Sequence, residues 1–301
     1  MEIINQKVEL LKQGPGIEGI YKQIELAGRT AYKSEDRITE DSAKKFVDML
    51  IKKGHGAALE HGIVYLKVPI NIDVAGNYLD SYFAKCKLVQ EKNREDNWWA
   101  ITTNYRYLLE YNLLNDLEEF ICEPTEYHLK SYTFKITTSR SIANEIVRHR
   151  VFSFMQESTR YCNYSAKKFN NELTYVIPSK FNLNTGYVEH HYNYGNEEYY
   201  MDNIKVNKFD NDYNFTPEYI WIDTLYHSSD AYLLMLKRGC KPEIARGVLP
   251  LDLKTELIVT GMEWDNFFKL RCAKDAHPDI QIIANKIKNI IKDEENPKKE
   301  I

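Results

Sequence analysis

The chain contains a short cationic segment, in which Arg148, His149 and Arg150 are followed after seven residues by Ser158 and then by Arg160. An arginine guanidinium is a rigid fork of hydrogen-bond donors that matches the oxygens of phosphate and carboxylate groups. Three arginines and a hydroxyl within thirteen residues therefore predict a binding site for an anion. A basic helix end in solvent is the alternative interpretation, because such clusters are not rare.

A helix is predicted immediately before this segment. In SIANEIVRHR, residues 141–150, Ile142 and Ile146 fall on one side of a helix, so the arginines emerge at its C-terminal end. Cations at that end face the negative pole of the helix dipole, which stabilises them by about 0.3 to 1 kcal/mol. The segment is therefore expected at the junction between a helix and the next element of the chain.

Other elements are predicted from hydrophobic periodicity and from capping residues. Strands are expected over residues 63–68 and 132–136 and in LTYVIP, which ends at Pro178. Helices are expected from a Thr39 cap to a stop at Gly54, after Asn104, from a Thr216 cap to Gly239, from Pro242 to Val248, and from His277-Pro278 onward.

Two stretches look like insertions into this framework. Residues 70–131 contain Trp98-Trp99 and enough apolar residues to fold onto the body of the protein, so they are read as an elaboration. Residues 182–215 are rich in Asn, Tyr, Asp and Gly and poor in aliphatic residues, which predicts a long surface loop. The tyrosines of this stretch could instead line a ligand or subunit contact.

Composition excludes several classes of protein. A chain of 301 residues with 43% hydrophobic residues can bury a sizeable core. A net charge of -4 argues against general nucleic-acid binding, which needs an excess of basic residues. The sequence shows no run apolar and long enough for a signal peptide or a membrane span, so a cytoplasmic protein is expected.

Cysteine and histidine usage predicts no metal site. The five cysteines are an odd number without CxxC spacing, which favours reduced thiols over disulfides or zinc ligands. The pair His190-His191 has no acidic or thiol ligand nearby at metal-binding spacing. The cysteines are Cys86, Cys122, Cys162, Cys240 and Cys272.

The complete run RHRVFSFMQESTRY resembles the signature of the flavin-dependent thymidylate synthases. Three further segments resemble this family in the same order along the chain: GHGAALEH at 54–61, EIARGVLPLDLKT at 243–255 and NFFKLRCAKDAHPDIQ at 266–281. The resemblance implies an α+β fold with a mixed or antiparallel sheet and packed helices. It also implies one domain over residues 1–301, with the insertions near 70–131 and 182–215.

The resemblance implies two sets of site residues. Arg271 would lie against the uracil ring of dUMP and act as the catalytic group. The other dUMP-binding residues would be Glu145, Arg148, Gln156, Glu157, Ser158, Thr159, Arg160 and Arg246. Flavin would be bound by His55, Ala57, Arg148, His149, Arg150, Gln156, Asn266 and His277. Each of these residues taken singly could also be an ordinary structural histidine or a salt-bridge partner.

The chain departs from the family pattern at two places. Glu145 stands where the family often has Gln, and a carboxylate there would repel a phosphate unless an arginine pairs with it. Met155-Gln156 replaces the common Asn-Glu, so that a charged acceptor has become a neutral amide. These differences leave open whether dUMP or a related pyrimidine nucleotide is preferred.

The implied reaction is reductive methylation of dUMP to dTMP. Methylenetetrahydrofolate would supply the carbon, FAD reduced by NADPH would supply the hydride, and a homotetramer would share its sites between chains. Ser158 is expected to bind phosphate, because His149 has no evident partner that would make it a base. No cysteine lies in the Pro-Cys-His context of the folate-only thymidylate synthases, so covalent thiol catalysis is rejected.

Two other classes of function remain open. The first is a nucleotide- or phosphate-binding homologue that lacks flavin chemistry. The second is an RNA-binding domain that uses the basic segment and nearby aromatic residues, which the acidic charge balance opposes. The G-x-G-x-x-G and G-x-x-x-x-G-K-[ST] motifs are missing from the sequence, so any anion must be held mainly by side chains.

Overall fold

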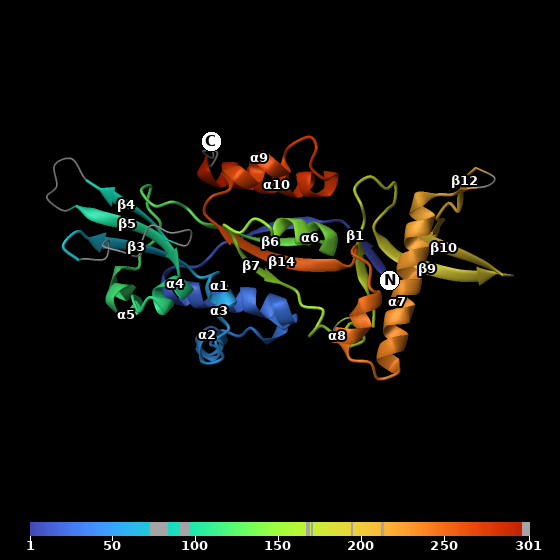
Figure 1. The fold of residues 1–301 in the computed structure, drawn as a ribbon, viewed down its shortest axis with the longest axis horizontal. Helices are drawn as coiled ribbons and strands as arrows, with labels where there is room; N and C mark the ends of the chain where they lie inside the picture. Colours follow the sequence, from blue (N-terminus) through green and yellow to red (C-terminus); the bar gives the residue numbers. More distant parts are fainter. Residues whose placement is uncertain are drawn as a thin grey trace.

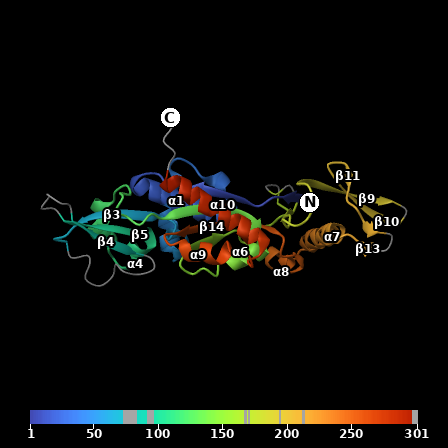
Figure 2. The ribbon, with the colours of Figure 1, turned by 90° about the horizontal axis from the view of Figure 1, so that it is seen from above.

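A four-stranded antiparallel sheet lies at the centre of an elongated molecule, between a three-stranded sheet and a five-stranded sheet at the two ends (Figures 1 and 2). The computed structural model describes residues 1–72, 84–90, 97–166, 169, 171–193, 195–211 and 214–296. No helix among these residues is both long enough and apolar enough to cross a membrane.

The central sheet has the strand order β2 (Lys7–Leu11), β6 (Tyr132–Ser139), β14 (Lys254–Gly261) and β7 (Ser153–Gln156). All neighbouring strands in it are antiparallel. Side chains alternate between its two faces, as the two-residue period of a strand requires. The two longest strands, β6 and β14, pair along their whole length.

One face of the central sheet is covered by α6 (Arg140–Ile146), α9 (Asp265–Arg271) and α10 (Pro278–Glu295) (Figure 1). Phe134 and Leu257 point to this side and pack with the apolar side of α10. Burying this apolar surface stabilises the fold by roughly 25 cal/mol per Å² removed from water.

The opposite face carries α1 (Gly16–Tyr32), α2 (Ser42–Lys52) and α3 (Gly56–Leu59). Gly28 allows α1 and α2 to approach closely, because a Cβ atom at this position would lie 2.7 Å from the ring of Phe46. Short 3-10 helices occur at Glu35–Arg37, Glu118–Phe120 and Arg246–Val248.

The stretch near residues 70–131 builds one end of the molecule. β3 (Ile63–Pro69), β5 (Trp98–Asn104) and β4 (Lys85–Val89) form the three-stranded sheet. The predicted helix after Asn104 is confirmed as α4 (Tyr105–Glu110), and the Asn104 side chain accepts the Tyr107 amide at 2.9 Å. The helix α5 (Leu114–Leu117) follows, and its Leu117 is fully buried in the core shared with α1.

The other end of the molecule is a five-stranded mixed sheet. Its order is β11 (Ile204–Lys205), β10 (Asn196–Met201), β9 (Gly186–Asn193), β1 (Glu2–Ile4) and β8 (Thr174–Val176). The long helix α7 (Pro217–Lys237) packs on it and is followed by α8 (Pro242–Ala245). A separate two-stranded sheet joins β12 (Phe209–Asn211) to β13 (Asn214–Phe215).

The prediction of a long surface loop over residues 182–215 is wrong. The physical reason is that buried and polar side chains alternate along these strands, which the amino-acid composition alone does not reveal. Val188 and Met201 are buried and point toward α7, and polar residues lie between them. The Thr39 cap is also wrong, because α2 begins at Ser42. The Thr39 amide instead donates to Ser42 Oγ at 2.9 Å. The expected α+β class with mixed and antiparallel pairing is confirmed.

Candidate functional site

Arg271, the last residue of α9, lies beside the Arg148-His149-Arg150 segment that follows α6. Its Nη1 donates to Glu145 Oε2 at 2.6 Å, and its Nη2 donates to the Glu145 carbonyl at 3.1 Å. Its Nε donates to His149 Nε2 at 2.9 Å. Two segments more than 120 residues apart in the sequence thus meet at one guanidinium.

His149 is held as a neutral acceptor. A guanidinium only donates, so His149 Nε2 must offer a lone pair and the ring proton must lie on Nδ1. Burial lowers the pKa of His149, and the nearby charge of Arg271 lowers it further. The ring also packs edge-on against Phe267 at 4.9 Å. This geometry fixes both the imidazole and the arginine that it contacts.

Arg148 and Arg150 are exposed at the end of α6. Within the described part of the chain neither guanidinium forms an ion pair. Two adjacent unpaired cations can hold an anionic group such as a diphosphate, because no internal carboxylate competes for them.

A second group of predicted residues lies at the other end of β7. Arg246 Nη1 donates to Thr159 Oγ1 at 3.0 Å, and Gln156 Nε2 donates to Thr255 Oγ1 at 3.2 Å. Ser158 Oγ accepts the Arg160 amide at 3.3 Å. Arg160 is exposed, with Nε 4.0 Å from Glu243 Oε2. These side chains gather two arginines and two hydroxyls on neighbouring loops.

Glu157 is directed into the protein interior. Its side chain is fully buried, accepts the Tyr164 hydroxyl at 3.0 Å, and pairs with Lys254 Nζ at 2.8 Å. Lys254 also pairs with Glu256, which contacts Lys33 and Lys135. Burial alone would raise the pKa of Glu256, but the ammonium groups around it lower that pKa to about 2. A buried ionic network therefore supports the loop that carries Ser158.

The remaining predicted residues lie on short elements around the sheet. His55 and Ala57 are exposed at the start of α3, which packs against α1 and β7. Asn266 is exposed on α9. His277 is the residue before α10, and its Nδ1 accepts the Asp279 amide at 3.2 Å. The structure thus places these four flavin-binding candidates at the starts of three helices, apart from those that follow α6 and those on β7.

Comparison with known proteins identifies the family. The family described as thymidylate synthase complementing protein matches residues 123–295, more than half of the chain. The chain belongs to this family. Its similarity to the flavin-dependent thymidylate synthases is therefore confirmed.

Individual relatives are distant. A flavin-dependent thymidylate synthase from Synechocystis is 26% identical over 69% of this chain and 83% of that protein. One from Geobacter sulfurreducens is 26% identical over 54% of this chain and 56% of that protein, so this match spans little more than half the length of the relative. A UMP/dUMP methylase, PolB, from Streptomyces cacaoi bound with 5-Br UMP is 17% identical, with a TM-score of 0.42, over 97% of this chain and 91% of that chain.

Arg140, which the sequence analysis did not single out, contacts the loop that carries the predicted residues Ser158 and Thr159. It begins α6, and its Nη1 lies 3.4 Å from Thr255 Oγ1 and 3.5 Å from the Glu157 carbonyl. The arginine therefore bridges β14 to the loop after β7. No local motif signals this role, because Thr255 and Arg140 are 115 residues apart.

Within one chain, the group of residues around Arg271 is separated from the group around Ser158 and Arg246. They flank β7, whose four residues span about 10 Å. A cavity of about 260 Å³ occurs elsewhere, among β2, β3 and the segment that precedes β6. None of its lining residues is a predicted site residue.

Proposed function

We propose that the chain catalyses the reductive methylation of dUMP to dTMP, with methylenetetrahydrofolate as carbon donor and FAD, reduced by NADPH, as the resident cofactor. Membership of the family and the activity named for its curated relatives support this assignment. The observation that carries it is the convergence of Glu145, His149 and Arg271 beside the Arg148-His149-Arg150 segment.

The residues present fit a flavin nucleotide. Arg148 and Arg150 offer unpaired, exposed guanidiniums of the kind that bind a diphosphate. His55, Ala57, Asn266 and His277 are exposed at the starts of α3, α9 and α10, and we propose that they complete the contacts. When bound, reduced FAD supplies the hydride of the reaction.

Arg271 is proposed to act on the pyrimidine ring. A guanidinium has five N–H groups, and Glu145 and His149 use three of them. One N–H on Nη1 and one on Nη2 remain as donors for a ring carbonyl. Because the arginine is already oriented, it can stabilise negative charge on the ring without reorganising during the reaction. Such a device needs no covalent enzyme nucleophile.

The phosphate of the nucleotide is assigned to the second group of residues. Ser158, Thr159, Arg160 and Arg246 supply two hydroxyls and two guanidiniums. Gln156 offers an amide at their edge. The carboxylate of Glu157 is already satisfied by Tyr164 and Lys254, so we propose that it positions this loop rather than contacting the nucleotide.

We propose further that a homotetramer completes each site, with residues of one chain facing those of another. The separation of the two groups along β7 supports this arrangement, because a single nucleotide and flavin would have to contact both. A shared site would also cover the exposed arginines on binding.

The visible spectrum of the purified chain tests the cofactor. We expect flavin absorption bands, either as purified or after addition of FAD, and a change in those bands when dUMP is added. A chain that stays colourless after incubation with FAD while still binding dUMP would overturn the enzyme and support a nucleotide-binding homologue. Titration with UMP in parallel decides between dUMP and a related pyrimidine nucleotide.

A further inference from the structure

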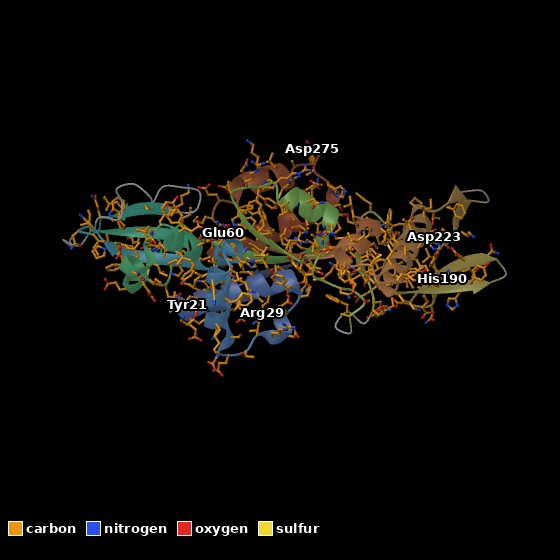
Figure 3. The ribbon with its side chains drawn as sticks, turned by 60° about the horizontal axis from the view of Figure 1, so that its bottom comes forward. Tyr21, Arg29, Glu60, His190, Asp223 and Asp275 are labelled. Atoms are coloured by element: carbon orange, nitrogen blue, oxygen red, sulfur yellow. The ribbon has the colours of Figure 1, made fainter. Side chains whose placement is uncertain are left out.

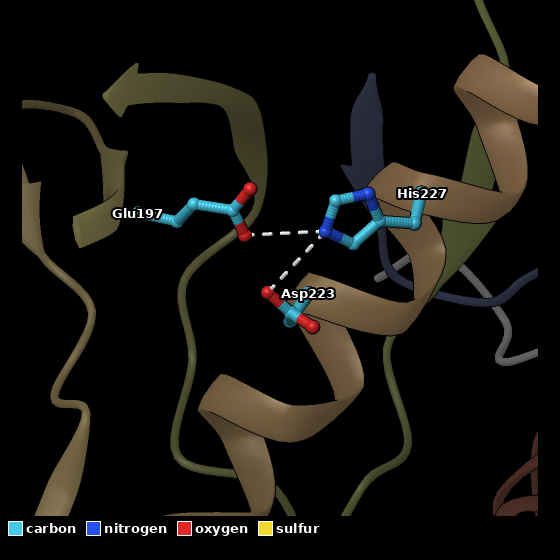
Figure 4. Close-up of side chains that lie close together, drawn as sticks. All are labelled: Glu197, Asp223 and His227. Carbon is cyan, nitrogen blue, oxygen red and sulfur yellow. Dashed lines mark hydrogen bonds and ion pairs between the residues drawn. The ribbon is translucent and has the colours of Figure 1, made fainter. Parts of the chain in front are cut away.

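Three side chains that can bind a metal ion meet at the end of the molecule opposite the three-stranded sheet. They are Glu197 on β10 and Asp223 and His227 on α7 (Figure 4). His227 Nε2 lies 3.2 Å from Glu197 Oε2 and 3.8 Å from Asp223 Oδ1. All three ligand atoms lie within 4.8 Å of one another. None of these residues belongs to the predicted flavin or nucleotide site.

The fold brings the three groups together through ordinary periodicities. Residues at every second position of β10 face α7, which places Glu197 on the same side as the buried Tyr199. Asp223 and His227 are four residues apart on α7, so they lie one above the other on the helix. His190 on β9 pairs opposite Tyr199 and faces the same helix, and Figure 3 shows His190 and Asp223 in this lobe.

The spacing of the ligand atoms matches metal coordination. A Zn²⁺ ion binds nitrogen and oxygen ligands at about 2.1 Å, so its ligand atoms lie about 3.0 Å apart in octahedral geometry and about 3.4 Å apart in tetrahedral geometry. The 3.2 Å separation between His227 Nε2 and Glu197 Oε2 lies between these two values, and the 3.8 Å separation from Asp223 Oδ1 is longer than both. An ion could therefore enter after small side-chain adjustments.

The surrounding charges also favour a cation. Within the described residues, neither Glu197 nor Asp223 forms an ion pair with a lysine or an arginine, and His227 is their shared partner.

Neighbouring tyrosines hold the carboxylate of Asp223 and the main chain at Glu197. The Tyr199 hydroxyl donates to Asp223 Oδ1 at 2.9 Å, and the Tyr219 hydroxyl donates to the Glu197 carbonyl at 3.1 Å. Hydrogen bonds of this kind orient metal ligands and raise affinity. Nearby, the ring of His190 lies 4.4 Å from the ring of Tyr226 and is tilted by 35° to it. Its Nε2 is buried with no hydrogen-bond partner in the described part of the chain. A second imidazole is therefore at hand beside the three ligands.

We propose that Glu197, Asp223 and His227 bind a divalent first-row metal ion, represented by Zn²⁺, which ties β10 to α7. One imidazole and two carboxylates form a mixed nitrogen and oxygen site of the type that Zn²⁺ and its neighbours occupy, with positions left for water. This site stabilises the lobe that the sequence had marked as a loop. It is independent of the reaction proposed above.

Isothermal titration of Zn²⁺ into the tag-free, EDTA-treated full chain tests this site. We expect one binding event that weakens at least tenfold in Glu197→Gln and in Asp223→Asn. Matched controls are Glu189→Gln and His191→Gln, which remove a surface histidine–carboxylate pair with a separation of 3.4 Å on the neighbouring strand. The five cysteines are present in every variant, so any binding by thiols cancels in the comparison.

His227→Gln guards against loss of folding, because the side chain of His227 is 54% exposed and its replacement leaves the core intact. We expect the same tenfold loss in this variant. We also expect Zn²⁺ to raise the melting temperature of the unmodified chain and not that of His227→Gln. Equal Zn²⁺ affinity in the unmodified chain and His227→Gln would overturn the proposal, as would an equal loss in the His191→Gln control.

Discussion

The carboxylate of Glu145 accepts a 2.6 Å hydrogen bond from Arg271 and so joins the end of α6 to the end of α9. The sequence comparison raised Glu145 as a departure that would repel a phosphate unless an arginine paired with it. The structure supplies that arginine. The carboxylate is therefore neutralised locally, and it orients the group that we assign to the pyrimidine ring.

Replacing Glu145 should lower turnover by loosening Arg271. Glu145→Ala removes a charge-assisted hydrogen bond of about 1.5 to 3 kcal/mol, so we expect kcat to fall tenfold or more. Glu145→Gln keeps an acceptor of the same shape and should recover most of the loss. Steady-state kinetics with dUMP measures both effects. Asn144→Ala, at the exposed neighbouring position, is the control; an equal decrease there would contradict this role for Glu145.

Removing the buried charge of Glu157 should destabilise the protein. Glu157→Gln leaves the ammonium of Lys254 with only the longer contact to Glu256 at 3.3 Å. We expect the free energy of unfolding to fall by about 3 to 5 kcal/mol, as for other broken buried pairs. Urea denaturation measures the change. Glu18→Gln, in the exposed pair with Lys22, should produce no detectable change, and a loss as large as that at Glu157 would show that burial is not the cause.

Stability should depend on pH through His61. Burial lowers the pKa of this histidine to about 4, and its Nδ1 lies 2.8 Å from Thr260 Oγ1. The folded state therefore resists protonation. The stability of the fold is not reduced by His61 above pH 6.5, which is about the pKa of a histidine in the unfolded chain. It is lost progressively as the pH falls toward 4. The loss should reach about 3 kcal/mol.

The variant His61→Asn isolates this effect, because the amide can still bond to Thr260 but does not titrate. Denaturant melts between pH 7 and pH 4 should show a shallower pH dependence for the variant than for the unmodified chain. The exposed His191→Asn serves as the control. Parallel curves for the unmodified chain and His61→Asn would exclude His61 as the group responsible.

Mixed tetramers should reveal whether sites are shared between chains. Arg271→Ala and Arg246→Ala chains are each expected to be inactive, because the two arginines serve different parts of the ligand. Suppose that a site takes Arg271 from one chain and Arg246 from another. When equal amounts of the two variants mix at random, each of the two arginines is present in about half of the sites, so both are present in about a quarter of them. Co-expression followed by an activity assay measures this fraction. Activity no greater than the sum of the separate variants would show that each site lies within one chain.

The features that the sequence predicts correctly are helix ends and caps, which depend on interactions between residues close together in the chain. The end of α6, the cap at Thr216 and the start of α10 depend on neighbours within a few residues, and the structure contains all three helices. The helix α1 was not predicted, because its three glycines obscure the helical pattern. Gly28 is explained only by its close approach to Phe46 of α2, and Gly19 by its close approach to the backbone of Gly14.

Long-range pairing explains what the sequence could not reveal about the site. Glu157 reads as a ligand within the motif, but its partner Lys254 is 97 residues away on β14. The strand β7 lies inside the motif and is recognised only through its pairing with β14. The cluster of Glu197, Asp223 and His227 likewise depends on the packing of α7 against a hairpin.

The release of tritium from dUMP labelled at C5 tests the central claim most directly. The flavin-loaded chain should release tritium when methylenetetrahydrofolate and NADPH are present. Arg271→Ala should retain its flavin spectrum but lose tritium release, whereas Arg238→Ala, an exposed arginine at the end of α7, should behave as the unmodified chain does. Normal tritium release by Arg271→Ala would contradict the role assigned to Arg271, and no release by the flavin-loaded unmodified chain would contradict the proposed reaction itself.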